Sequence, residues 1–159
     1  MAYYDLATIN TAIEETLTVG QVAGLKRSQD VDELSDNIPE SDLPLLQVVP
    51  QSWGDGSFSQ TQVNTFTGHG TNSQAFKTKE WIFDVYVYVS TLSKIRVGMQ
   101  RLVTIASAIE EIIDGQENLK HPFGQEAIRS FTHQSERINI NYSGVDLLCI
   151  HITITCNIF

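Results

Sequence analysis

Two segments of the chain alternate apolar and mixed side chains with a period of two, and this pattern constrains the fold most. Side chains of a β-strand point alternately to opposite faces of a sheet, so each segment predicts a strand with one buried face. The apolar sets are Trp81, Phe83, Val85, Val87 and Val89 in residues 80–89, and Leu148, Ile150, Ile152, Ile154, Cys156 and Ile158 in residues 145–158. The opposite faces are semi-polar, which predicts a sheet that is fully covered on one side only.

Two other segments carry apolar residues at helical spacing. Residues 94–114 have an apolar stripe, with Ser93 as a candidate cap and Gly115 as a candidate stop. Residues 5–25 show a second stripe, which Asp5 precedes as a candidate cap. The stripes are Ile95, Met99, Leu102, Ala106, Ile109 and Ile113, and Leu6, Ile9, Ile13 and Leu17.

Shorter signals complete the order of elements. We expect a loop at 28–42, a strand from Leu43 to Val49, a strand over 126–140 and a turn at 142–144. The 159 residues suffice for one domain, which we assign to 1–159. The predicted fold class is α+β: a mostly antiparallel sheet with two main helices packed on one face, plus a long polar arm or loop.

The arm comprises residues 51–76, which contain a single charge, Asp55, among many Gln, Ser, Thr, Asn and Gly residues. Such a segment has too little apolar content to form a core of its own, and we expect it to pair with a neighbouring copy. The candidate interface residues are Trp53, Phe58, Phe66, Phe76, Asp84 and Phe159.

The formal net charge of −9 is concentrated in the first half of the chain. Residues 1–76 hold ten acids and two bases, a balance of −8, whereas residues 77–159 are nearly neutral. Neither half offers the basic face that specific DNA binding requires. An acidic surface either repels DNA that passes nearby or is simply solvated, and both interpretations stay open. The candidate acids for lining a channel are Asp30, Asp32, Glu33 and Asp36.

No catalytic or metal-binding motif is written in the sequence. The four histidines stand apart from one another, and no nucleophile elbow or phosphate loop is present. We expect no enzyme, cofactor or metal site, although residues gathered only by folding stay open. His133 and His151 are expected to be ordinary cross-strand neighbours, and Asp84 a solvent-facing or interface residue rather than an activated acid.

Nothing in the sequence predicts a membrane span or a secretory signal, so we expect a soluble protein that stays where it is made. Cys149 and Cys156 are an odd number of residues apart on one strand, so they point to opposite faces and cannot bond to each other.

The order of parts resembles the tail terminator, or tail completion, proteins of long-tailed bacteriophages. The resemblance rests on the helix at 9–17, the strand at 43–50, the strand at 81–89 with the long helix after it, and the closing segment 141–157. It implies a ring, usually of six copies, that caps the finished tail tube and joins it to the head. The implied partners are the tail tube protein and a neck or connector protein, and the implied location is the virion tail or neck, assembled in the bacterial cytoplasm. DNA passes through such a ring without specific binding.

Two other interpretations remain open. Another neck or head–tail connector protein would also form a ring but would contact the portal side. A small-ligand-binding domain or an enzyme would require a pocket with convergent polar groups.

Overall fold

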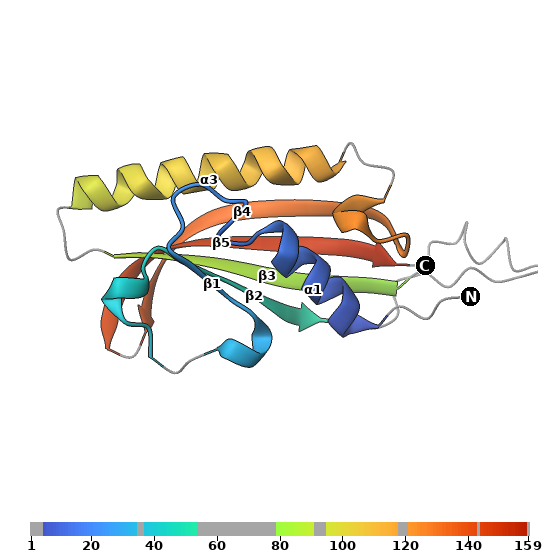
Figure 1. Cartoon of the computed structure of the whole chain (residues 1–159), viewed down its shortest axis with the longest axis horizontal. Coiled ribbons are helices and arrows are strands. Elements are labelled where there is room, and N and C mark those ends of the chain that lie inside the picture. The colour runs from blue at the N-terminus through green and yellow to red at the C-terminus, as the bar shows by residue number, and fades with distance from the viewer. Residues whose placement is uncertain are drawn as a thin grey trace, which may run out of the picture.

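The computed structural model describes residues 5–34, 37–53, 79–90, 95–117, 121–142 and 144–158. These residues form two α-helices, three short 3-10 helices and a five-stranded sheet (Figure 1). The elements are α1 (Leu6–Thr16), β1 (Arg27–Gln29), η1 (Val31–Glu33), η2 (Glu40–Asp42), β2 (Leu45–Ser52), β3 (Lys79–Ser90), α3 (Ile95–Glu117), η3 (Pro122–Gly124), β4 (Ile128–Tyr142) and β5 (Val145–Ile158).

The strand order is β1-β2-β3-β5-β4, and every neighbouring pair is antiparallel except β1 and β2. Residues from α1, α3 and one face of the sheet share a single buried cluster, so both helices pack on that face. We call it the helix face. Helix α3 lies along this face and runs opposite to the direction of β4 (Figure 1). The predicted α+β class, the mostly antiparallel sheet and the one-sided helices are therefore confirmed.

The opposite side of the sheet, the far face, is only partly covered. At one end it forms a smaller apolar cluster, to which Ile38 and Leu43 contribute from the segment that precedes β2. The sheet residues of this cluster include Leu45, Tyr88 and Cys149. Toward the other end of the strands the same face becomes polar, as the alternation in the sequence indicates.

Several element boundaries differ from the sequence prediction. The first helix ends at Thr16 rather than near residue 25, because Leu17 leaves the helical conformation and Gly20 and Gly24 follow it. The expected loop at 28–42 begins with β1, a three-residue strand too short to show a periodicity. Conversely, α3 continues through Gly115 to Glu117, so that glycine does not end the helix.

A bulge explains the mixed alternation that precedes the final hairpin. The pairing of β4 with β5 shifts between Ile128 and Ser130, which leaves Arg129 without an opposite residue. Because a bulge inserts one extra residue, Ile128 and Phe131 both reach the helix-face core although three positions separate them.

Candidate functional site

Two histidines lie between carboxylates, one on each face of the sheet. His151 projects from β5 on the far face, where its Nε2 lies 2.7 Å from Oδ1 of Asp84 and its Nδ1 lies 3.0 Å from Oε1 of Glu136. The ring of Tyr86 stacks on the imidazole with a centroid separation of 4.9 Å. Strand register produces this group, because Tyr86 and Glu136 both pair directly with His151.

The surroundings of His151 favour its charged form. Burial opposes protonation, but the hydrogen bonds and negative charges of Asp84 and Glu136 outweigh burial and raise the pKa of His151 above 6.5. Both ring nitrogens face carboxylates, which leaves neither nitrogen available to accept a proton from a nucleophile. The group therefore suits a structural ion pair better than acid–base catalysis.

Further polar side chains extend the group around His151 across the far face, and we call the whole set the polar row. Gln47 on β2 pairs with Tyr86, and its Nε2 donates a hydrogen bond of 2.7 Å to Oε1 of Gln29 on β1. Both amides are buried, at 4% and 2% exposure. All five strands thus contribute polar side chains to this row on the far face.

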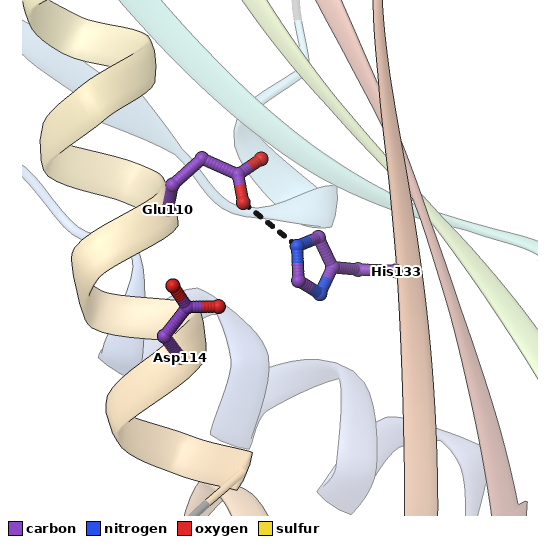
Figure 2. Close-up of side chains that lie close together, drawn as sticks. All are labelled: Glu110, Asp114 and His133. Carbon is purple, nitrogen blue, oxygen red and sulfur yellow. Dashed lines mark hydrogen bonds and ion pairs between the residues drawn. The ribbon is translucent and has the colours of Figure 1, made fainter.

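The second histidine, His133, projects from β4 on the helix face and meets acids of α3. Its Nε2 lies 2.7 Å from Oε2 of Glu110, and Ser135 donates a hydrogen bond of 2.6 Å to the other oxygen of that carboxylate. Asp114, one helical turn after Glu110, points toward the same imidazole (Figure 2). Burial opposes ionisation of Glu110, but the bonds from Ser135 and His133 outweigh it and lower its pKa.

A third feature is the outer edge of β4. This strand has fifteen residues and pairs only with β5 among the described strands, whereas β1 at the other edge has three residues. Most of its side chains beyond the bulge are exposed. A long strand at the edge of a sheet presents backbone N–H and C=O groups that can pair with another chain.

The structure places few of the predicted site residues together. Trp53 directly follows β2 and is 59% exposed, as an interface residue would be. Asp84 is not solvent-facing, because it is 6% exposed and bonded to His151. Its role at an interface stays a prediction. Phe58, Phe66, Phe76 and Phe159 lie outside the described residues.

The candidate channel acids lie at or near η1. Asp30 and Glu33 are exposed at its two ends, whereas the side chain of Asp32 and all of Asp36 lie outside the description. Only the arrangement of copies in an assembly would show whether these acids face a channel, so their place there stays a prediction.

The expected pairing of His133 with His151 is wrong. His133 pairs with Ile154 and His151 with Glu136, and the two imidazoles lie on opposite faces. The carboxylate partners of both histidines were not predicted from the sequence. The available signals were the spacing of Glu110 and Asp114, which places them on one face of a helix, and the isolated acid in the apolar strand β3.

No protein-family model matches the chain, and no curated protein is detectably similar to it in sequence. Among the described residues, no helix is both long and apolar enough to span a membrane.

Proposed function

We propose that this chain is a structural virion protein without catalytic activity, which assembles into a ring at the end of a bacteriophage tail tube. In this role the ring, of six copies, caps the tube and joins it to the neck connector. Assembly takes place in the bacterial cytoplasm. The resemblance in the order of elements motivates the proposal, and the observation that carries it is the long outer edge of β4.

The two edges of the sheet differ in a way that favours head-to-tail association. The outer side of β4 offers up to fifteen residues of backbone, whereas β1 offers three. An interface that joins two different surfaces generates a closed ring when the rotation between copies closes. Pairing of an extended segment of one copy with β4 of the next would supply such an interface. The arm at 51–76, with Asp55 as its single charge, is our candidate for that segment, and its residues 54–76 lie outside the described residues.

The histidine groups also support a structural role. Both nitrogens of His151 face carboxylates, and Nε2 of His133 is bonded to Glu110. Among the described residues, neither imidazole is hydrogen-bonded to a serine or cysteine nucleophile, since Ser135 bonds to Glu110 and not to the ring.

Native mass spectrometry of the purified chain tests the ring. We expect a closed oligomer for the wild type and dissociation for Thr132→Lys, because a charge in the middle of an edge strand opposes strand addition. Thr132 is exposed, so the substitution should leave the fold intact. The matched control is Thr104→Lys on the exposed side of α3, which should assemble as the wild type does. A wild type that stays monomeric at all concentrations would contradict the proposal.

Electron microscopy of particles made without this protein separates a terminator from a connector. Loss of a terminator should give tails of abnormal length, whereas loss of a connector should leave finished tails detached from heads. Thermal stabilisation by a small molecule would instead favour a ligand-binding domain.

A further inference from the structure

We propose that Glu110, Asp114 and His133 form a site for a divalent transition-metal ion of the zinc class, which would link α3 to β4. One donor atom from each of these residues lies within 4.8 Å of the other two, and both carboxylates point from the helix toward the imidazole (Figure 2). This inference does not depend on the proposed ring.

The three donors are held by two rigid elements. Glu110 and Asp114 stand four residues apart on α3, so they lie on the same side of the helix, one turn from each other. His133 lies on the side of β4 that faces α3, two residues after the buried Phe131. The site therefore needs no flexible segment to bring its ligands together.

The donor set fits zinc-like ions rather than magnesium. Imidazole nitrogen is a preferred ligand of Zn²⁺, Ni²⁺ and Co²⁺, whereas Mg²⁺ favours oxygen ligands and retains its water. Three protein ligands, one histidine and two carboxylates, leave one tetrahedral position for water. Asp114 is exposed, and an open hollow of about 590 Å³ beside α3 is lined in part by Glu110 and Asp114. An ion can therefore reach the site from solvent.

Neighbouring groups already hold the ligands in suitable orientations. Ser135 binds one oxygen of Glu110, which leaves Oε2 directed at Nε2 of His133. Nδ1 of His133 is buried without a hydrogen-bond partner, but Oε1 of Glu117 lies only 3.3 Å away. A ligating histidine usually donates its second ring N–H to a carboxylate, and Glu117 is placed to accept that bond. The ion would take the position of the proton that Glu110 and Nε2 share, and that proton would be released.

The histidine on the far face lacks this arrangement. The carboxylates of His151 lie at opposite ring nitrogens, so they do not converge on one point. His151 therefore provides a control within the same protein, because it contacts two carboxylates but should not bind the ion.

The test uses untagged full-length protein that has been treated with a chelator and dialysed. Calorimetric titration with Zn²⁺ should give one site per chain, whereas Mg²⁺ should give no heat of binding. In long-range ¹⁵N–¹H spectra, Zn²⁺ should shift Nε2 of His133 and leave the ring of His151 unchanged. Because this measurement uses the wild type, it does not depend on whether a variant folds.

Variants then assign the ligands. His133→Gln and Asp114→Asn should each abolish binding, and Glu117→Gln should weaken it by about 10–100-fold through loss of ring orientation. His121→Gln, which removes a histidine from the start of η3, is the matched control and should bind as the wild type does. Absence of binding, or binding that leaves the His133 ring unchanged, would overturn the proposal.

Discussion

The two faces of the sheet are built from the same strands but are stabilised in different ways. The helix face is a continuous apolar surface buried by α1 and α3, and Phe83, Val85 and Ile154 are fully buried there. The far face has a small apolar cluster at one end and a polar row centred on His151 beyond it. Since burial of apolar area supplies most of the folding free energy, the helix face holds the domain together. On the far face, the exposed side chains include Thr132, Gln134 and Glu136 of β4.

If the helix face supplies most of the stability, a charge placed in its core should have the largest effect of any substitution. Ile109 is fully buried on α3, so Ile109→Asp should lower the free energy of unfolding by several kcal/mol, on the order of a domain's whole stability. The measurement is urea denaturation followed by circular dichroism. Val103→Asp on the same helix is the control, because Val103 is 57% exposed and should tolerate the charge. Equal free energies of unfolding for the two variants would show that the buried stripe of α3 is assigned wrongly.

A smaller loss is expected on the far face. Asp84→Ala removes the partner of His151 Nε2 and should lower the free energy of unfolding by about 1–3 kcal/mol, the usual effect of leaving a buried polar group unsatisfied. Glu136→Ala removes the other carboxylate, whose side chain is 60% exposed, and should cost less than about 1 kcal/mol. A larger loss of unfolding free energy for Glu136→Ala than for Asp84→Ala would contradict this. It would show that the exposed contact of His151 with Glu136 stabilises the fold more than the buried contact with Asp84.

Periodicity predicted the helix face well because each of its residues obeys a local rule. The alternation in β3 and β5 identified every apolar side chain that these two strands contribute to the helix-face core, and the stripe of α3 identified Ile109 and Ile113. An apolar stripe predicts burial whichever element packs against it. The core positions could therefore be predicted without knowing which helix covers which strand.

The polar groups could not be predicted in the same way, because they depend on register between distant segments. Asp84 and His151 are 67 residues apart in sequence, and only the β3–β5 pairing brings them within 2.7 Å. Likewise, the bulge after Ile128 sets which side of β4 His133 occupies. A one-residue shift in register would place each imidazole on the opposite face.

The pH dependence of stability sharpens the contrast between the faces. The pKa of His151 is raised in the folded protein relative to its ordinary value of 6.5, so the folded state binds the proton more tightly than the unfolded state. Its stabilising contribution is therefore fully present below about pH 6.5 and is lost as the pH rises through the folded value. We expect Asp84→Asn to reduce the fall in unfolding free energy between about pH 6 and about pH 9. An unchanged slope in this variant would exclude Asp84 as the cause.

The smallest expected effect is the response to DNA. The exposed acids Asp30 and Glu33, two of the candidate channel acids, lie at the two ends of η1. Like charges repel over a Debye length of about 8 Å at physiological salt, so a channel lined by these acids would let DNA pass without adhering. In a mobility-shift assay at low salt, micromolar protein should leave duplex DNA unretarded. Reversing charges with Asp30→Lys and Glu33→Lys should increase retention by the ring more than Glu15→Lys and Glu111→Lys on the helices, because only the former pair would face the axis. Equal retention by the two double variants would place the acids of η1 on the outside of the ring.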